Sequence, residues 1–276
     1  MKDCLILYNM KKIPQDIIGD IAVLKFPLKG INSWSFIKKL KAKQFLKQNP
    51  SVKTVLEKTE KFSGELRLQK TKFLAGINKK ETTYKENNCL FKFNVDETYF
   101  SPRLSNERKL AAEEILNQIK KNKTPHPKIV VMFSGVAPYP ITIAKTLKQN
   151  GIKAKIISSE LNTEASKYAE ENVELNKLED YIQVIDGDSK KLPEKIKFKA
   201  DFILMPRPNL EETFLKTALK LSKKSTRIYY HGFGTKEKVL NEINNEIKSK
   251  VKNIQIRKAG DIGPYIFRWL VSFVVK

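Results

Sequence analysis

The chain has 276 residues, and its basic side chains outnumber the acidic ones by 53 to 30, a formal net charge of +23. A charge of this size favours a polyanionic partner, because each phosphate that a lysine or arginine neutralises releases a counterion. No apolar run approaches the roughly 20 residues that cross a bilayer, and residues 1–12 are too short and too charged for a secretion signal. We therefore expect a cytoplasmic protein that binds nucleic acid and no membrane.

The sequence contains no recognisable metal-binding motif. Its two cysteines are Cys4 and Cys89, its two histidines are His126 and His231, and their spacing matches no known set of ligands. We therefore expect no bound metal, and we expect each thiol to be a small buried hydrophobic group.

Residues 1–95 predict a small α+β domain that contacts RNA. Strand-like patterns recur along this part of the chain, and one helical pattern interrupts them. The strand-like segments are residues 18–26, 52–60, 64–76 and 89–95.

The helical pattern at residues 35–53 combines an apolar stripe with a cluster of lysines. Phe36, Leu40, Phe45 and Leu46 form the stripe, and the lysines occupy the other face. Such a face can be an ordinary solvated surface or a surface that binds RNA, and both interpretations stay open here. The candidate RNA-binding residues are Lys38, Lys39, Lys41 and Lys43, together with Arg67 in the strand-like segment that follows.

Residues 96–276 predict a second, α/β domain. Strand and helix patterns alternate along it, which indicates βαβ units, a mostly parallel Rossmann-like sheet, and a ligand crevice at the carboxyl ends of the strands. The clearest break is residues 121–128, where two prolines separate a helix from the first sheet strand. The predicted strands are residues 128–133, 153–160, 181–186, 200–205 and 227–233, and two further strands close the chain.

Three successive strand ends predict a nucleoside-binding site. Residues 128–145 contain a strand, a turn and a helix, and the small residues Ser134, Gly135 and Ala137 in the turn allow a ligand to approach the backbone. Glu160 ends the next strand, where a carboxylate can accept both ribose hydroxyls, and Asp188 follows the third, where it suits an adenine amino group. The turn lacks the three-glycine dinucleotide pattern and any GKS or GKT phosphate loop, which favours S-adenosylmethionine over NAD and ATP. Each of these residues, taken alone, also fits a loop position with a purely structural role.

Four segments resemble a known family of RNA-modifying enzymes. They are "SGELRLQKTKFLAG" (63–76), "ETYFSPRLSNER" (97–108), "MFSGVAPYPI" (132–141) and the run from Glu160 to Ser189. Together they are similar to the archaeal and eukaryotic tRNA (guanine-N1)-methyltransferases, which modify guanosine 37, next to the anticodon. The resemblance implies a class I S-adenosylmethionine-dependent methyltransferase domain preceded by an RNA-contacting domain. It begins near Asp16, so we expect the family's further N-terminal module to be absent.

The helix that begins near Ser101 carries the expected chemistry. Ser101 and Pro102 suit an N-cap and a first turn, so Arg103 and Glu107 should share one helix face. As a surface ion pair they would contribute only on the order of a few tenths of a kcal/mol. Methylation of guanine N1 removes the N1 proton while negative charge builds on O6, which suits a carboxylate beside a guanidinium. By resemblance, Glu107 matches the base and Arg103 the group that stabilises O6.

The sequence departs from the family pattern at the site itself. Val131 stands where the family carries an acidic residue, and Ala137 where it carries a second glycine. The fourth motif, usually Asn-Leu-Pro, is "MPRPN" here, with Pro206 in place of asparagine. An archaeal subgroup with this proline is associated with wyosine biosynthesis, which implies methylation of C7 of 4-demethylwyosine as well as of guanosine N1. A flat ring without an N–H suits this larger tricyclic base.

We expect a monomeric enzyme whose partner is tRNA, with tRNA-Phe among its substrates. The residues that we assign to ligands form two further sets, one for the target base and one for the cofactor. Tyr99 matches a pocket aromatic of the family but is equally compatible with a core position. The target-base set is Pro206, Arg207, Pro208, Asn209 and Arg108. The cofactor set is Tyr99, Phe133, Ser134, Gly135, Val136, Ala137, Pro138, Glu160, Leu161, Asp188, Ser189 and Met205.

Two other functions stay open on the sequence alone. The aminocarboxypropyl transferase of the wyosine pathway uses the same scaffold and cofactor but moves a different group, although the pair Arg103 and Glu107 counts against it. A non-catalytic RNA-binding protein that kept the fold would account for Val131 and Pro206. Such a protein would bind RNA but not S-adenosylmethionine.

Overall fold

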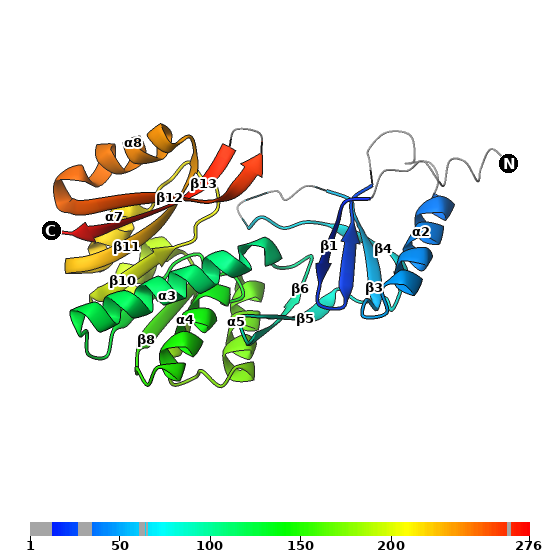
Figure 1. The fold of residues 1–276 in the computed structure, drawn as a ribbon, viewed down its shortest axis with the longest axis horizontal. Helices are drawn as coiled ribbons and strands as arrows, with labels where there is room; N and C mark the ends of the chain where they lie inside the picture. The colour runs from blue at the N-terminus through cyan, green and yellow to red at the C-terminus, as the bar shows by residue number, and fades with distance from the viewer. Residues whose placement is uncertain (1–12, 27–34, 61–63, 65, 264–265) are drawn as a thin grey trace. The chain divides into compact units, whose positions relative to one another are not determined.

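Two compact units make up the chain (Figure 1). One comprises residues 1–85 with 92–99, and the other comprises residues 86–91 with 100–276. The single domain boundary expected between residues 95 and 96 stays a prediction, and by its contacts segment 86–91 belongs to the second unit. Cys4 and the rest of residues 1–12 lie outside the described residues. The computed structural model describes residues 13–26, 35–60, 64, 66–263 and 266–276.

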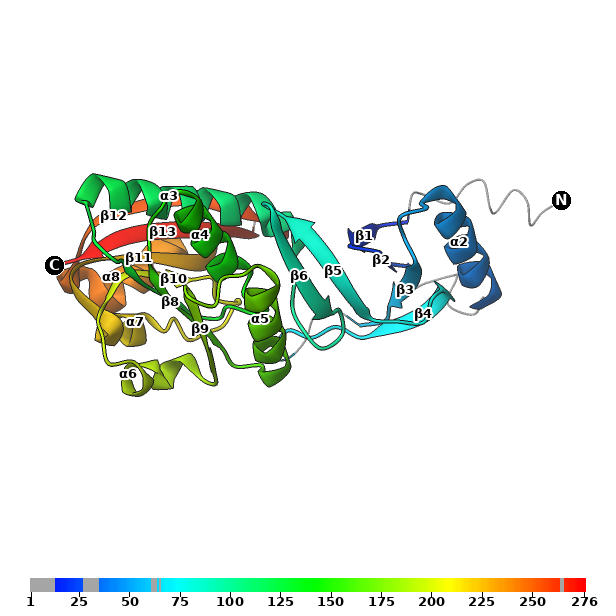
Figure 2. The same ribbon diagram turned by 90° about the horizontal axis from the view of Figure 1, so that it is seen from below.

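The first unit contains a mixed four-stranded sheet with the strand order β1-β2-β3-β4. β2 and β3 run parallel, with α2 between them in the chain, and the other neighbours pair antiparallel. Leu24, Val55 and Leu74 belong to the core of this unit, and α2 packs on β3 and β4 through Ala42 (Figure 2). The elements are β1 (Gln15–Ile18), β2 (Ile21–Leu24), α2 (Ser35–Gln48), β3 (Thr54–Lys58) and β4 (Thr71–Gly76).

Residues 18–26, which the sequence predicted as one strand, belong instead to a tight hairpin. β1 and β2 pair antiparallel, and Gly19 between them has φ +58°, where a Cβ atom would lie 2.3 Å from Thr82 Oγ1. The turn therefore needs glycine, which ends the first strand at Ile18. In the same way, the strand predicted at 64–76 begins only at Thr71.

A second hairpin follows, of which the sequence predicted only the second strand. It consists of β5 (Glu81–Glu86) and β6 (Cys89–Asn94), which form their own two-stranded sheet. The turn residues Asn87 and Asn88 have φ 49° and 59°. Two positive φ angles are typical of the type I′ turn, which matches the twist of the strands and which asparagine tolerates.

The buried face of α2 is not the apolar stripe that the sequence predicted. Phe36 is 72% exposed and Leu40 is 43% exposed, whereas Lys38 and Ala42 are buried. The small side chain of Ala42 lets the helix approach the sheet, and this contact decides which face turns inward. Phe45 and Leu46, from the predicted stripe, pack at the margin of the same core.

Lys38, assigned to RNA binding, is buried and paired within the unit, which does not favour that role. Its Nζ lies 2.6 Å from Glu57 Oε1 and 5.4 Å from the centre of the Phe26 ring. The aliphatic stem packs inward and the charge is neutralised within the unit. Of the other lysines assigned to RNA, Lys39 and Lys43 are exposed and Lys41 is half-buried.

The second unit is built around a seven-stranded sheet with the order β12-β13-β11-β10-β7-β8-β9. β9, β8, β7, β10 and β11 run parallel, and β13 runs antiparallel between β11 and β12. The predicted mostly parallel sheet is therefore confirmed. The strands are β7 (Lys128–Val131), β8 (Lys155–Glu160), β9 (Ile182–Asp186), β10 (Ala200–Met205), β11 (Ser222–Gly234), β12 (Val251–Gly263) and β13 (Ile266–Val275).

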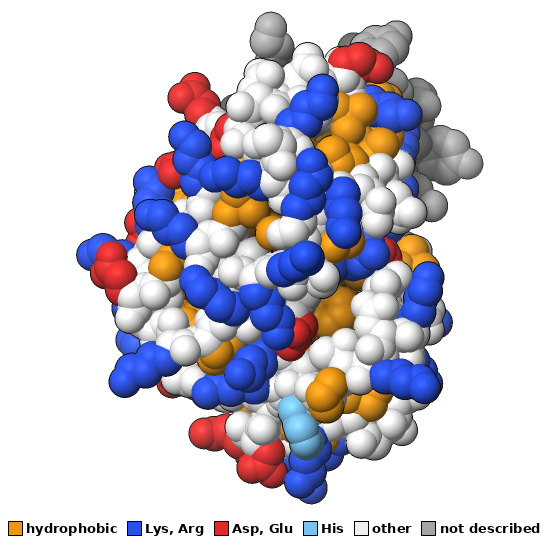
Figure 3. Space-filling view, turned by 90° about the vertical axis from the view of Figure 1, so that its left-hand side faces the viewer, with side chains coloured by type: hydrophobic (Ala, Val, Ile, Leu, Met, Phe, Trp, Pro, Cys, Tyr) orange, Lys and Arg blue, Asp and Glu red, His pale blue; other side chains and the backbone are white. Residues whose placement is uncertain are grey.

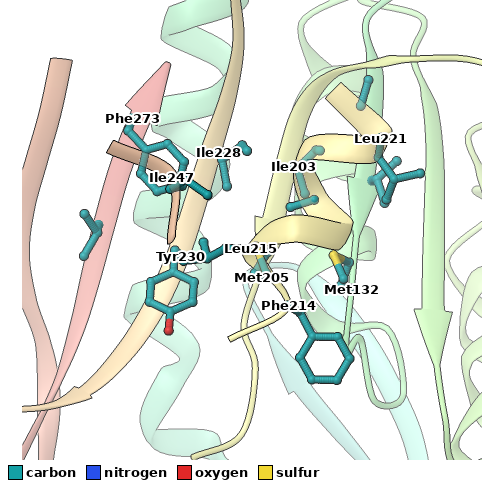
Figure 4. Close-up of a cluster of buried hydrophobic side chains, with 14 of the residues drawn as sticks. Met132, Ile203, Met205, Phe214, Leu215, Leu221, Ile228, Tyr230, Ile247 and Phe273 are labelled. Carbon is teal, nitrogen blue, oxygen red and sulfur yellow. The ribbon is translucent and has the colours of Figure 1, made fainter. Parts of the chain in front are cut away.

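Helices cover both faces of this sheet (Figures 1 and 2). α3, α4 and α5 lie on one face, and α6, α7 and α8 lie on the other, where Ile203, Leu215 and Tyr230 belong to the apolar core (Figure 4). The helices are α3 (Ser105–Asn122), α4 (Pro138–Gln149), α5 (Thr163–Leu175), α6 (Leu192–Lys195), α7 (Leu215–Leu221) and α8 (Lys236–Ile247), with 3-10 turns η1 (Pro102–Leu104), η2 (Ser189–Lys191) and η3 (Lys248–Lys250).

The strand order reverses between β7 and β10. From β7 the chain proceeds to β8 and β9 on one side, and from β10 it proceeds to β11 on the other. In open α/β sheets, ligands bind at this switch point, beyond the carboxyl ends of the strands. The segments that follow Val131 and Met205 therefore mark where a ligand should bind.

Cys89 is fully buried, and burial raises the pKa of its thiol to about 11, which confirms the small hydrophobic role expected for it. Among the residues that the structure describes, no group of three or more candidate ligands could hold a metal ion. No helix in the described part of the chain is both long and apolar enough to cross a membrane.

His231 is a buried titratable group in the middle of β11. Its side chain packs edge-on against Tyr139, with 6.0 Å between the ring centres, and its Nε2 has no hydrogen-bond partner among the described residues. Burial, reinforced by the positive charges of Arg268, Arg257 and Arg207, lowers the pKa of His231 to about 3. The imidazole is therefore neutral in the folded protein at all ordinary pH values.

We predict that His231 makes the second unit acid-sensitive. The unfolded chain binds this proton below its ordinary pKa of 6.5, but the folded chain binds it only near pH 3, so folding stability is lost as the pH falls between these values. The loss is about 1.4 kcal/mol per pH unit. Denaturant titrations at pH 4 to 7 should show this slope removed in His231→Phe, which keeps an aromatic ring.

His126→Gln is the matched control, because His126 is exposed and lies in the loop before β7. It should leave the pH slope of the wild-type protein unchanged. Equal slopes in the wild-type protein and in His231→Phe would contradict the assignment.

Candidate active site at the carboxyl ends of the central strands

The loop that follows β7, residues 133–138, adopts a backbone that most side chains avoid. Phe133, Gly135 and Ala137 have φ 56°, 56° and 64°, all in the left-handed region. A residue with a Cβ atom costs about 1–2 kcal/mol there, so Phe133 and Ala137 are strained and Gly135 is not. Ala137 is fully buried and is the N-cap residue of α4, so the surrounding structure holds it in place.

Four buried serines tie this loop to the neighbouring strand ends. Ser134 Oγ donates to the Ser159 carbonyl at 3.0 Å, and Ser158 Oγ donates to Ser134 Oγ at 2.8 Å. Ser159 Oγ lies 3.3 Å from Ser189 Oγ at the start of η2. The hydroxyls of Ser134 and Ser189, both assigned to the cofactor, therefore serve to hold the loop against β8 and η2.

Glu160 joins the loop to the end of β8. Its Oε2 accepts a hydrogen bond from Gly135 N at 2.7 Å, and its Oε1 accepts one from Asn162 N at 2.9 Å. Burial raises the pKa of Glu160, although the N–H groups of Asn162, Gly135 and Leu161 act in the opposite direction. The carboxylate is thus fixed at the strand end where the sequence predicted a ribose-binding acid.

Asp188 caps the 3-10 turn after β9. Its Oδ1 accepts a hydrogen bond from Lys190 N at 2.9 Å, and its side chain is half-buried. Gly187 before it donates its N–H to the Glu160 carbonyl at 2.7 Å, with φ +120°. The second and third strand ends are therefore joined directly. Of the remaining cofactor residues, Val136, Met205 and Pro138 are buried and Leu161 is 39% exposed.

Arg207, which the sequence assigned to the target-base pocket, is buried and turned into the protein. Only 2% of it is exposed, and its guanidinium donates to the Leu210 carbonyl at 2.8 Å and to Tyr230 Oη at 2.6 Å. It also lies 3.5 Å from Glu242 on α8. Arg207 therefore holds the segment after β10 against β11 and α8. Pro206 and Pro208 are half-buried and Asn209 is exposed.

Glu107, the expected base, is buried and paired with an arginine that the sequence did not single out. Arg257 on β12 donates through Nη1 to Oε2 and through Nη2 to Oε1 of Glu107, each at 2.7 Å. The two residues are 150 positions apart, so no local pattern could have revealed the contact. Burial and the charge of Glu107 both raise the pKa of Tyr139, which places the carboxylate near the start of α4.

The start of α3 explains why Glu107 is not paired with Arg103. The chain forms the 3-10 turn η1 first and becomes α-helical only at Ser105. Arg103 therefore precedes the α-helix, and the i, i+4 spacing does not place it on the same helix face as Glu107. Arg103 is exposed whereas Glu107 is buried. Pro102 occupies the first turn as predicted, but Ser101 makes no side-chain capping bond.

Arg108, assigned to the target base, forms a buried ion pair with Glu86. Its Nη2 lies 2.6 Å from Glu86 Oε2, and both side chains are 2% exposed. The same nitrogen donates to the Ser101 carbonyl at 3.0 Å, and the guanidinium lies 5.0 Å from the centre of the Phe100 ring. Arg108 thus fixes the segment that leads into α3, and its expected contact with the target base stays a prediction.

Tyr99 and Arg67 are described within the first unit. The Arg67 guanidinium lies 4.9 Å from the centre of the Tyr99 ring, a distance typical of a cation–π contact. Arg67 itself has φ 51°. The residue assigned to RNA and the residue assigned to the pocket are therefore neighbours, which the sequence did not predict.

Residues 82–258 match the family model of the TRM5/TYW2 methyltransferase domain. The chain belongs to the TRM5/TYW2 methyltransferase family. The resemblance stated from the sequence is confirmed, and so is the class I methyltransferase fold.

Several relatives in this family are tRNA-modifying enzymes. Taw22 of Nanoarchaeum equitans, a tRNA (guanine(37)-N(1))/4-demethylwyosine(37)-methyltransferase, is 45% identical over 163 residues, 59% of this chain and 48% of Taw22. Taw21 of Saccharolobus solfataricus, a tRNA 4-demethylwyosine(37)-methyltransferase, is 31% identical over 78% of this chain and 76% of Taw21. The crystal structure of Trm5b from Pyrococcus abyssi matches with a TM-score of 0.73 and 30% identity, over 95% of this chain and 75% of that one. The chain spans about half the length of several curated relatives it matches, Taw22 among them.

The backbone explains one departure from the TRM5/TYW2 pattern. By resemblance, a glycine is usual at the position of Ala137, and φ 64° is an angle that glycine adopts without strain. The loop therefore keeps a glycine-like conformation although its residue is alanine. Val131, the other departure, is fully buried in β7, as an apolar residue of a central strand should be.

We predict that the Glu86–Arg108 pair is needed for the stability of this TRM5/TYW2 domain. Arg108→Met leaves the buried Glu86 carboxylate without its partner, which should lower the free energy of unfolding by about 3–5 kcal/mol. The double variant Glu86→Leu/Arg108→Met buries no charge and should recover most of this loss. Urea titrations of the three proteins provide the comparison. A double variant less stable than Arg108→Met alone would contradict the pairing.

Proposed function

We propose that this protein transfers a methyl group from S-adenosylmethionine to N1 of guanosine 37 in tRNA. The observation that carries the proposal is the buried, ion-paired carboxylate of Glu107 in a chain of the TRM5/TYW2 family. A carboxylate held at a fixed place by an arginine is a group that can accept the proton that guanine N1 must lose.

The chemistry depends on removing one proton. Guanine N1 becomes nucleophilic when Glu107 takes the N1 proton, and the electron pair left on N1 then forms the bond to the methyl carbon. S-adenosylmethionine supplies this methyl group on a positively charged sulfur, and the carbon–sulfur bond breaks with its electrons on sulfur. Negative charge builds on O6 as the proton leaves, and by the family resemblance the exposed Arg103 stabilises it.

The strand ends around the loop suit S-adenosylmethionine. Glu160 Oε2 accepts the Gly135 N–H and Oε1 accepts the Asn162 N–H, so the backbone holds the carboxylate at the end of β8 with acceptor capacity left for a ribose hydroxyl. A hydroxyl donor would stabilise the ionised form that burial disfavours. Asp188, beyond β9, is the candidate for the adenine amino group, and Gly135 lets the ligand approach the backbone.

A second substrate, the wyosine precursor 4-demethylwyosine, is supported by Pro206. This half-buried proline follows β10 and offers a flat ring without a backbone N–H, which accommodates a tricyclic base better than a hydrogen-bonding asparagine would. Methylation of its C7 does not need the N1 proton removed. It should therefore tolerate the loss of Glu107 better than N1 methylation does.

For the partner, we propose that tRNA, tRNA-Phe included, binds through the first unit of a cytoplasmic monomer. The sequence of α2 contains five lysines and no acidic residue, and Lys39 and Lys43 lie on its exposed side. Basic side chains are also spread over the face shown in Figure 3, so the positive charge is not confined to α2. Phosphates of a long RNA could therefore contact both units.

Mass spectrometry of nucleosides tests the reaction directly. Wild-type protein, tRNA and S-adenosylmethionine should yield N1-methylguanosine, and tRNA carrying the tricyclic precursor should yield its C7-methylated form. Glu107→Gln keeps the shape and removes the proton acceptor, so its single-turnover N1 methylation should fall by about 100-fold or more.

Calorimetry provides the control for this experiment. Glu107→Gln should bind the cofactor normally, whereas Glu160→Ala should bind it weakly. A product heavier by an aminocarboxypropyl group would establish the other transferase activity. Binding of RNA without binding of S-adenosylmethionine would establish a non-catalytic protein.

We predict that Lys39 and Lys43 contribute to tRNA affinity by counterion release. Lys39→Gln/Lys43→Gln should weaken tRNA binding and reduce the slope of log affinity against log salt by about two. The matched control is Lys216→Gln/Lys220→Gln, which removes the same charge from the exposed side of α7. Equal salt slopes in the two double variants would exclude a specific role for α2.

A further inference from the structure

We propose that Arg257 is the positioning residue of the general base, holding the Glu107 carboxylate in the orientation that guanine N1 requires. This role rests on the proposed function, and it extends the site to a strand near the end of the chain. Arg257 lies on β12, which pairs with β13 at the edge of the sheet.

The geometry of the pair fixes the carboxylate in one orientation. Both guanidinium Nη atoms bond to Glu107, one to each carboxylate oxygen, at 2.7 Å. A planar fork of this kind defines the carboxylate plane as well as its position. The Glu107 side chain is 7% exposed and that of Arg257 is 38% exposed, so the arginine is the member of the pair that lies nearer the solvent.

The electrostatic reason for the pair is the burial of Glu107. A carboxylate removed from water without a partner would favour its neutral form, which cannot accept a proton. Glu114 and Tyr139 also lie close, and neither supplies a positive charge. Arg108, the next residue along α3, is bonded to Glu86. Arg257 is the arginine that bonds directly to both oxygens of the buried Glu107 carboxylate.

The pair leaves room for the substrate proton. Each carboxylate oxygen has two lone pairs and uses one for Arg257, so guanine N1–H can donate to another without displacing the arginine. When the proton arrives, Glu107 becomes neutral and Arg257 loses its counter-charge. Its uncompensated positive charge then favours negative charge on the base that gave up the proton, which lowers the energy of the proton transfer.

The pairing of β12 with β13 is irregular near Arg257, which suits a strand that directs this side chain towards Glu107. The register between β12 and β13 shifts between Lys252 and Gln255 and again between Lys258 and Gly260, on both sides of Arg257. Bulges of this kind bend a strand and redirect its side chains, and they are frequent beside active sites. The regular pairing of Arg257 with Leu270 lies between the two shifts.

The test is a double-mutant cycle on the methylation rate. At saturating tRNA and S-adenosylmethionine, Arg257→Met should lower the single-turnover rate of N1 methylation by about 100-fold, with cofactor affinity unchanged. Arg257→Lys, which keeps the charge but loses the fork, should fall between this variant and the wild-type protein. Glu107→Gln/Arg257→Met should be within about twofold of Glu107→Gln alone, because Arg257 acts through Glu107.

The control is Lys258→Gln, the neighbouring position on β12, whose ammonium is paired with Asp261 at the surface. It should leave the rate unchanged. Multiplicative losses in the double variant, or a wild-type rate in Arg257→Met, would overturn the positioning role.

Two further measurements keep this result separate from its alternatives. Wild-type protein that makes no methylguanosine would refute the proposed function itself. If Arg257→Met does not fold, Arg257→Lys provides the test. A wild-type methylation rate in Arg257→Lys, with an unchanged melting temperature, would overturn the requirement for two parallel hydrogen bonds from a guanidinium.

Discussion

The burial of the Glu107 carboxylate is the constraint on which the rest of the candidate site depends. A carboxylate that is removed from water must find a cation or lose its charge. The cation comes from β12, which belongs to the same sheet because β13 runs antiparallel between β11 and β12. The last two strands therefore supply the partner of the carboxylate at the start of α3, although the two residues are 150 positions apart in the chain.

Buried arginines hold two segments of the second unit, one before α3 and one after β10. Arg108 bonds to Glu86 and to the Ser101 carbonyl before α3, and Arg207 bonds to the Leu210 carbonyl after β10. The guanidinium suits this task because it offers several donors in one plane and can satisfy backbone carbonyls and a carboxylate together. Both residues hold the backbone of these segments in place.

Hydrogen bonds also hold the loop after β7, in a backbone conformation that costs free energy. Phe133 and Ala137 have left-handed φ angles, and the serine network with the Glu160 carboxylate supplies the hydrogen bonds that offset the strain. A loop that is fixed before a ligand binds loses little entropy when the ligand arrives. The strain at Ala137 is thus consistent with a preformed binding site.

The sequence by itself determined the alternation of strands and helices in the second unit, because hydrophobic periodicity is a local property. It also determined which strand ends carry Gly135, Glu160 and Asp188. Only the tertiary structure decided which face of α2 is buried, since Ala42 and the paired Lys38 outweigh an apolar stripe. Likewise, only the fold turned Arg207 inward and brought Arg257 to Glu107. Contacts between charges that are distant in the chain leave no periodic pattern in the sequence. They form because the charged groups are buried together, and this burial exists only once the sheet has formed.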